Sequence, residues 1–397
     1  MKNKITIAAD IFLPDIGGPA TYSVKLAEFL LSAGFNVSLI CYSDSRQEDH
    51  YTFKVSRIKR SKIKPWNYLK YFLVLLKLSF FSDIIYAQGP VNAGLPALLA
   101  AKILRKKLVV KVVGDYAWEQ LRNSNLQELI SIDQFQAKKF SGKIGWLQAI
   151  ESLVCRGADI VITPSDYLNK LVVGWGVKSQ RVKTVYNSFV RPKDLPLRDH
   201  SRQELGFGND EFIVVSAGRP VPWKGFGLLH IAVSELVKQE KLPLKLRILG
   251  INPEDLSRFI KQESDVSSPI DEGFIKQEAL GKQPKGVVYK YLMAANAFVL
   301  NTGYEGLSHV LLEAMSCGLP IITTNVCGNP ELIEHGFNGL LIDYNNKDQL
   351  KENLALLYKD QDLRRKFVDN SYQVIAKFSF DRLKEDTIKI FNSLLLS

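Results

Sequence analysis

Short apolar runs rich in β-branched residues alternate along this chain with longer stretches of helical periodicity. A stretch such as 22–34 has apolar side chains on one face of a helix, as expected for a helix packed on a sheet. Short apolar runs in which apolar and polar residues do not strictly alternate are typical of strands buried on both faces. In the first half of the chain they fall at 4–10, 36–42, 83–88, 107–114 and 159–165. The pattern predicts a mostly parallel sheet covered by helices.

The same pattern restarts after a polar, proline-containing stretch at 187–211, which predicts a linker. Five more apolar runs follow, at 212–219, 244–250, 297–302, 320–325 and 339–343. We therefore expect an α/β protein of two doubly wound, Rossmann-like domains that face each other across a cleft, an N-terminal one over 1–190 and a C-terminal one over 191–376. The length of 397 residues suits two domains of ordinary size.

Charge is distributed unevenly along the chain. Residues 1–200 carry 29 Lys and Arg against 16 Asp and Glu, whereas the remainder carries 23 against 25. Much of the excess lies in 54–81, where a basic run precedes an aromatic and aliphatic segment. That segment is shorter than the about 20 apolar residues that span a bilayer, and Lys70 and Lys77 interrupt it. Two interpretations stay open: a helix lying on an anionic membrane surface, or a basic loop before a half-buried helix.

Several classes of protein are disfavoured. No DNA or RNA motif accompanies the basic run, so nucleic acid is not an expected partner. The four cysteines are widely spaced and form no Cys-x-x-Cys pattern, which argues against a zinc site and a disulfide framework. The first ten residues lack the apolar core of a signal peptide. We expect a cytoplasmic protein that is at most peripheral on the inner face of the cell membrane.

The loops that follow the strands are the expected place for chemistry, because ligands bind at the carboxyl ends of parallel strands. After the first strand, Gly17 and Gly18 either let the backbone approach an anion such as phosphate or form a plain turn. After the strand at 212–219, Arg219 and Lys224 either neutralise a diphosphate or are ordinary surface charges.

A third loop contains two glutamates. Glu305 follows the strand at 297–302, and Glu313 lies on the helix after it. An ionised carboxylate only accepts hydrogen bonds, so it suits the vicinal hydroxyls of a sugar or a ribose. The alternative is a loop charge and a solvated helix position.

Four segments together resemble the family 4 retaining glycosyltransferases, which have the GT-B fold. They are GGPATYS from Gly17, GRPVPWKGF from Gly218, EGLSHVLLEAMSCGLPIITTNVCGNPELI from Glu305, and FSFDRLKEDTIKIF from Phe378. The resemblance covers nearly the whole chain. Its most specific element is the pair of glutamates with seven residues between them, followed by Gly-Asn-Pro-Glu at 328–331, close to the family's Gly-Gly-x-Pro-Glu.

The resemblance implies a role for each loop. Glu305 would hold hydroxyls of the donor sugar near its anomeric carbon, and Glu313 would bind the ribose of the nucleotide. Arg219 and Lys224 would hold the diphosphate, assisted by the glycines of the first loop and by backbone amides at Leu307 and Ser308. The family needs no metal or cofactor beyond the nucleotide sugar, and its terminal helix, here 377–397, packs back on the N-terminal domain.

The implied reaction moves a sugar of the hexose type from a UDP- or GDP-sugar to a hydroxyl of a glycan or lipid-linked acceptor, as in cell-surface polysaccharide assembly, with retention at the anomeric carbon. We favour front-face displacement over a double displacement, because no protein nucleophile is evident. A sugar-nucleotide epimerase and a catalytically silent binding protein remain alternatives. A Rossmann dehydrogenase is disfavoured by the absence of Gly-x-Gly-x-x-Gly after the first strand.

One position departs from the family pattern. Many members have a histidine after the strand at 107–114, where this chain has Asp115. Asp115 either takes over the sugar contact, orients the acceptor hydroxyl, or caps the next helix. Tyr116, Trp118 and Glu119 are the expected wall of the acceptor site.

Overall fold

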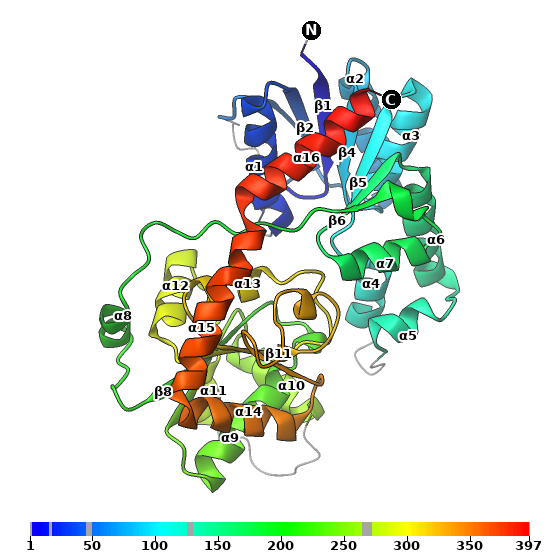
Figure 1. Cartoon of the computed structure of the whole chain (residues 1–397). Helices are drawn as coiled ribbons and strands as arrows, with labels where there is room; N and C mark the ends of the chain where they lie inside the picture. Colours follow the sequence, from blue (N-terminus) through cyan, green and yellow to red (C-terminus); the bar gives the residue numbers. More distant parts are fainter. Residues whose placement is uncertain (1, 16–17, 45–49, 125–129, 264–271, 397) are drawn as a thin grey trace. The chain divides into compact units, whose positions relative to one another are not determined.

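The computed structural model describes residues 2–15, 18–44, 50–124, 130–263 and 272–396. The chain divides into two compact units (Figure 1). Unit 1 comprises Met1–Leu121, Phe135–Tyr186 and Leu383–Ser397, and unit 2 comprises Arg122–Gln134 and Asn187–Arg382. Each unit is built around its own parallel sheet.

The sheet of unit 1 has the strand order β3-β2-β1-β4-β5-β6-β7, with every neighbouring pair parallel. Its central strands are buried along almost their whole length, which explains their continuous apolar sequences. The order reverses between β1 and β4, so the loops after these two strands diverge to opposite faces and leave a crevice for a ligand. The strands are β1 (Lys4–Ala9), β2 (Asn36–Tyr42), β3 (Lys54–Ile58), β4 (Ile84–Gln88), β5 (Lys107–Lys111), β6 (Ile160–Thr163) and β7 (Val182–Thr184).

Helices cover both faces of this sheet. Right-handed crossovers place α1, which leads from β1 to β2, on the face opposite to α2 and α3, whose crossovers run the other way. On the face of α1, Phe391 of α16 packs edge-on against Phe35 and Tyr86. The helices that lie wholly or mainly in unit 1 are α1 (Gly18–Ser32), α2 (Lys64–Ser79), α3 (Gly94–Leu104), α4 (Tyr116–Ser124), α6 (Gly142–Gly157), α7 (Asp166–Gly174) and α16 (Phe380–Leu395). A short helix, α5 (Ile132–Gln136), spans a boundary between the two units.

The sheet of unit 2 is parallel, in the order β12-β11-β10-β8-β9, and reverses between β8 and β10. Its core consists mainly of apolar side chains from the sheet and from α9, α10 and α14, with contributions from α11 and α15. The strands are β8 (Phe212–Ala217), β9 (Leu244–Leu249), β10 (Ala297–Leu300), β11 (Ile321–Thr324) and β12 (Leu340–Ile342). The α-helices are α8 (Arg198–Glu204), α9 (Phe226–Gln239), α10 (Pro253–Glu263), α11 (Glu272–Glu278), α12 (Lys285–Ala294), α13 (His309–Ser316), α14 (Lys347–Lys359) and α15 (Gln361–Ile375).

The expected linker at 187–211 is only partly a linker. Its middle forms α8, which packs on α12, and Arg202 of α8 donates a hydrogen bond of 2.9 Å to the carbonyl of Ala294. Arg202 is 6% exposed, so the polar composition that suggested a linker includes a buried cation that binds helix-end carbonyls.

The predicted fold class is confirmed in its secondary structure and sheets, and ten predicted strands are present. Two further strands, β3 and β7, were missed. Both are edge strands of the sheet in unit 1, with exposed charged residues such as Lys54 and Lys183. Charged side chains on an edge discourage pairing with another chain, and they also hide the apolar pattern by which strands are recognised. Within the described ranges, every helix is too short or too polar to cross a membrane.

Candidate functional site

The loops at the β8–β10 reversal of unit 2 bring Lys224 and Glu305 together. Lys224 ends a short 3-10 turn after β8, at Pro222–Lys224, and Glu305 follows β10. The Lys224 ammonium forms an ion pair with the Glu305 carboxylate. Their side chains are 9% and 18% exposed, so both charges are largely removed from water. The sequence assigned these residues to two separate loops, and the structure shows that they are one feature.

Two hydrogen bonds to one backbone carbonyl fix the loop of Lys224 against the loop of Glu305. The Thr302 hydroxyl donates to the carbonyl of Trp223 at 3.1 Å, and the amide of Gly303 donates to the same carbonyl at 2.7 Å. Gly225, at φ +52°, allows the two loops to approach, because a Cβ there would lie 2.3 Å from the side-chain nitrogen Nδ2 of Asn301. The ammonium is therefore held next to the carboxylate by rigid backbone.

The Gly-Asn-Pro-Glu segment supports the same loop from the other side. The Gly328 amide donates to the carbonyl of Glu305 at 3.0 Å. A Cβ on Gly328 would lie 2.2 Å from the carbonyl oxygen of Gly306, so only glycine fits. Asn329 is fully buried and donates to the Thr324 hydroxyl at 3.1 Å. This motif acts by positioning the backbone beneath Glu305.

Helix α13 begins beside Glu305 and has an unused hydrogen-bonding group at its start. Ser308 is the N-cap residue, but its side chain makes no capping bond. Its hydroxyl oxygen is buried and has no hydrogen-bond partner in the described part of the chain. The amides of a helix start favour an anion, and the hydroxyl adds a further donor. Leu307 and Ser308 are 5% and 2% exposed, so the backbone, together with this hydroxyl, is what they offer a ligand.

The other two predicted residues of this site do not join the Lys224–Glu305 pair. Glu313 lies further along α13 and forms an ion pair of 3.0 Å with Lys285 of α12. The Glu313 side chain is 17% exposed, so it is neither a fully solvated charge nor a buried one. Arg219 is exposed, and its side chain makes no hydrogen bond or ion pair to a described residue. Its guanidinium is open to an anionic ligand.

The β1–β4 reversal of unit 1 contains a polar network that the sequence did not reveal. The Asn92 side-chain amide donates to Asp10 Oδ2 at 3.1 Å, and the Tyr68 hydroxyl donates to Asn92 Oδ1 at 2.7 Å. Asp10 Oδ1 is buried without a hydrogen-bond partner among the described residues. Burial raises the pKa of Asp10 to about 6. Residues 10 and 92 are distant in sequence, and only the strand order brings them together.

Of the two glycines that the sequence placed in the first loop, the structure describes only Gly18. Gly17 lies outside the described residues. Gly18 is the first residue of α1, and a proline is the second. Proline fits a first helical turn because the amide that it lacks has no intrahelical partner there.

Asp115 caps α4. Its Oδ1 accepts the amide of Trp118 at 2.7 Å, and its Oδ2 accepts the Gln136 side-chain amide at 2.6 Å. Burial raises its pKa to about 6. Glu151 of α6 accepts the amide of Tyr116 at 2.8 Å, and burial raises its pKa well above the usual range. Of the roles left open by the sequence, the structure shows the cap.

The expected acceptor wall is only partly at the surface. Trp118 is 1% exposed and belongs to the interior, because its large apolar ring is buried when α4 packs on the unit. Trp118 therefore has almost no exposed surface with which to contact an acceptor in this structure, contrary to the expectation from the sequence. Tyr116 and Glu119 are half-buried, which leaves part of each side chain accessible.

Comparison with known families decides the class of protein. Residues 17–188 match the model described as "Glycosyl transferase 4-like domain", and residues 198–374 match "Glycosyl transferases group 1". Together these matches cover most of both units. The chain belongs to family 4 of the glycosyltransferases.

Relatives of this glycosyltransferase include the UDP-Gal:alpha-D-GlcNAc-diphosphoundecaprenol alpha-1,3-galactosyltransferase of Escherichia coli. The two sequences are 23% identical over 396 residues, which is 96% of each chain. An uncharacterised glycosyltransferase of Methanocaldococcus jannaschii is 25% identical over 62% of this chain and 63% of its own.

Solved structures place this glycosyltransferase among GT-B proteins. Sucrose-phosphate synthase from Thermosynechococcus elongatus superposes with a TM-score of 0.76 at 17% identity, over the full length of both chains. HepE of Anabaena, in its complex with UDP-glucose, superposes with a TM-score of 0.73 at 18% identity, over 98% of this chain and 99% of that one. The predicted GT-B fold is thereby confirmed.

Proposed function

We propose that this glycosyltransferase transfers a hexose from a UDP- or GDP-sugar to a hydroxyl of a glycan or lipid-linked acceptor, with retention at the anomeric carbon. The observation that carries the proposal is the Lys224–Glu305 ion pair at the β8–β10 reversal, beside the start of α13. A largely buried cation next to a helix start suits a diphosphate, and a carboxylate beside it suits the attached sugar.

Donor binding exchanges the partners of this pair. The diphosphate takes the Lys224 ammonium, with the exposed Arg219 as a second cation and the Ser308 hydroxyl and nearby amides as neutral donors. Glu305 is then released to accept hydrogen bonds from the sugar hydroxyls. Glu313, on the same helix, accepts the ribose hydroxyls in place of its Lys285 contact.

The transfer step follows the front-face route. The bond between the anomeric carbon and the phosphate oxygen breaks, and the acceptor oxygen bonds to the same face of that carbon. The acceptor proton passes to the departing phosphate oxygen, so the step needs no protein base. Lys224, Arg219 and the helix start stabilise the charge that develops on the phosphate. Among the described residues no three His, Cys, Asp or Glu side chains form a set suited to a metal ion, and metal independence stays a prediction.

The acceptor hydroxyl is proposed to bind in unit 1 at the β1–β4 reversal. Asp10 offers a buried carboxylate oxygen that accepts no hydrogen bond from a described residue, and the Asn92 side-chain amide holds the other oxygen in place. Tyr116 and Glu119 are the accessible part of the surroundings. Asp115 then acts as a positioning residue through α4, since both of its oxygens already accept protein hydrogen bonds.

The test is to measure release of the nucleotide from UDP- and GDP-sugars, with and without lipid-linked glycan acceptors. Glu305→Ala should lower kcat about 100-fold with a small change in donor affinity, because its bonds strengthen only as the sugar reacts. Glu313→Ala should weaken donor binding about tenfold with kcat largely kept, as expected for one charged hydrogen bond. Glu352→Ala, at an exposed position on α14, is the control.

The outcomes also separate the alternatives. If neither donor is bound, the transferase proposal fails. Donor binding without turnover of any acceptor would favour a silent binding protein, and a change in the configuration of the free nucleotide sugar would favour an epimerase. A product with inverted anomeric configuration would overturn the retaining mechanism alone.

A further inference from the structure

The outer face of α2 carries large apolar side chains in contact with water. Trp66, Leu69 and Leu73 are spaced at three and four residues and are 48%, 45% and 53% exposed. Phe80 and Phe81, at the end of the helix, are 56% and 76% exposed. Apolar side chains with this spacing lie on one face of a helix. Single exposed apolar side chains are common in folded proteins, but a contiguous exposed apolar face of a helix is not, so it requires an explanation.

The same feature continues onto two neighbouring helices. Helix α3 packs against both α2 and α6, and the three cover one face of the sheet in unit 1. Leu99 and Ile103 of α3 are 48% and 62% exposed, and Trp146 and Leu153 of α6 are 57% and 51% exposed. We call the exposed residues of these helices, with Phe80 and Phe81, the α2–α3–α6 surface.

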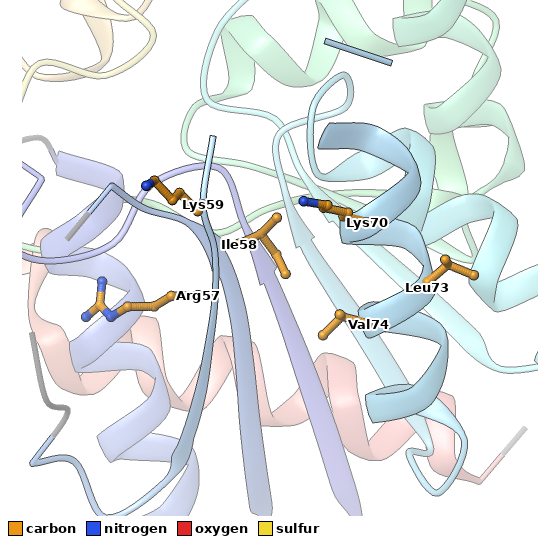
Figure 2. Close-up of a pocket in the computed structure, with 6 residues that line it drawn as sticks. All are labelled: Arg57, Ile58, Lys59, Lys70, Leu73 and Val74. Carbon is orange, nitrogen blue, oxygen red and sulfur yellow. The ribbon is translucent and has the colours of Figure 1, made fainter. Parts of the chain in front are cut away.

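The parts of this surface on α2 and α3, with Phe80 and Phe81, lie in the most cationic part of the chain. Residues 54–114 contain thirteen Lys and Arg and a single acidic residue, Asp83. Figure 2 shows a groove between β3 and α2, with the ammonium groups of Lys59 and Lys70 on either side of Ile58. Its volume is about 310 Å³, and Leu73 and Val74 complete its apolar side. An apolar floor flanked by two cations suits the phosphate and upper acyl chain of an anionic lipid.

We propose that the α2–α3–α6 surface binds an anionic phospholipid bilayer, with the groove at Lys59 and Lys70 receiving a lipid phosphate. Apolar side chains enter the interface between headgroups and acyl chains, where tryptophan is favoured, and lysines reach the phosphates. The near absence of acidic residues argues for a bilayer of negative charge over a protein partner, whose surface would carry both signs. The proposal needs no donor or acceptor, so it stands or falls separately from the proposed transfer reaction.

The structure also changes the predicted membrane segment. The sequence limited it to 54–81, whereas α3 and α6 extend the exposed apolar face across the sheet. The sequence left open a half-buried helix or a helix on a membrane surface, and α2 has features of both. Tyr71 and Leu75 are buried on one side of α2, while the opposite side is exposed to water. Binding that uses both an apolar face and several cations needs both contributions to be stable.

The experiment is flotation of the full chain with vesicles of neutral phosphatidylcholine, or of the same lipid with about a third phosphatidylglycerol. Each lysine near an anionic surface contributes about fivefold to binding. The triple variant Lys62→Gln/Lys70→Gln/Lys77→Gln should therefore bind anionic vesicles about 100-fold more weakly. The matched control removes the same charge elsewhere and should bind like the wild type. It changes the exposed residues Lys25, Lys261 and Lys359 to Gln.

A second pair of substitutions tests the apolar contribution without risk to the core. Leu69→Ser/Leu73→Ser changes side chains that are about half exposed, and it should lower binding about tenfold or more at constant charge. The proposal is overturned if the wild type floats with neither vesicle or equally with both. It is also overturned if the lysine variant matches its control, if the serine variant binds unchanged, or if the surface instead mediates self-association in solution.

Discussion

Gly328→Ala should displace the loop of Glu305 without changing any residue that touches the substrates. The new Cβ would lie 2.2 Å from the carbonyl oxygen of Gly306 and 3.3 Å from that of Glu305. Contacts to carbon below about 3 Å are not tolerated, so the loop must move by the order of 1 Å. The move also breaks the 3.0 Å hydrogen bond from the Gly328 amide to Glu305. Overpacking and the lost bond together cost about 2–3 kcal/mol.

This cost predicts two separable measurements. The melting temperature should fall by about 5–10 °C, since 1 kcal/mol shifts a unit of this size by about 2–4 °C. The rate constant kcat should fall about 100-fold, because a misplacement of 1 Å at a reacting group costs that much. Differential scanning fluorimetry and release of the nucleotide report them. Gly174→Ala is the control and should change neither, because a new Cβ there would meet no atom of the described residues within 4 Å.

The reasoning is refuted if Gly328→Ala melts lower than the wild type but turns over at an unchanged rate. That result would mean that the Gly-Asn-Pro-Glu segment stabilises unit 2 without positioning Glu305. It is equally refuted if the variant has unchanged stability, because the carbonyl contact would then not exist. A parallel loss in both variants would point to a general sensitivity of the assay.

Two further predictions use buried carboxyl groups. Burial raises the pKa of Glu263, which accepts the amide of Leu228 at the start of α9, to about 7. Because this folded pKa lies above the unfolded value near 4.5, Glu263 stabilises the fold at low pH and loses that contribution as the pH rises through 7. Urea unfolding should show the wild type losing roughly 2–3 kcal/mol relative to Glu263→Gln between pH 5 and 8, and parallel pH profiles would contradict this. Burial raises the pKa of Asp10 to about 6, so its carboxyl group ionises between pH 5 and 7. The KM for the acceptor should fall over this range in the wild type, because the ionised carboxylate accepts the acceptor hydroxyl, and it should stay constant in Asp10→Asn. The KM for the donor should not change, and a change in the donor KM alone would contradict the proposed acceptor role.

Much of the fold could be predicted because buried parallel strands produce a signal within each short segment. The strands that were missed, β3 and β7, are edge strands, where burial is incomplete and charged residues interrupt the apolar pattern. Helix α8 was missed because Arg202 is buried by binding carbonyl oxygens, an arrangement that polar composition does not indicate.

In the candidate site, single residues could be predicted from their own loops, but contacts between residues distant in sequence could not. Lys224 and Glu305 could be selected from their loops, but their ion pair joins residues 81 positions apart and depends on the contacts of Thr302. Trp118 was expected at an acceptor surface because it follows a strand, yet helix packing buries it. A position after a strand locates a residue at the correct edge of the sheet and leaves its orientation undetermined.

The strand reversals of the two sheets carry different chemistry, and the difference suits the donor and the acceptor that we propose for them. At the β8–β10 reversal, Lys224 and Glu305 form an ion pair. A diphosphate can replace Glu305 as the partner of Lys224, and the sugar hydroxyls then donate hydrogen bonds to Glu305. At the β1–β4 reversal, burial raises the pKa of Asp10 to about 6, the Asn92 and Tyr68 side chains next to it are neutral, and the charge of Arg60 is the smallest influence on that pKa. A hydroxyl is an uncharged donor, so it needs an acceptor oxygen and gains little from a fixed cation. We therefore expect ionic strength to change the KM for the donor more than the KM for an uncharged acceptor.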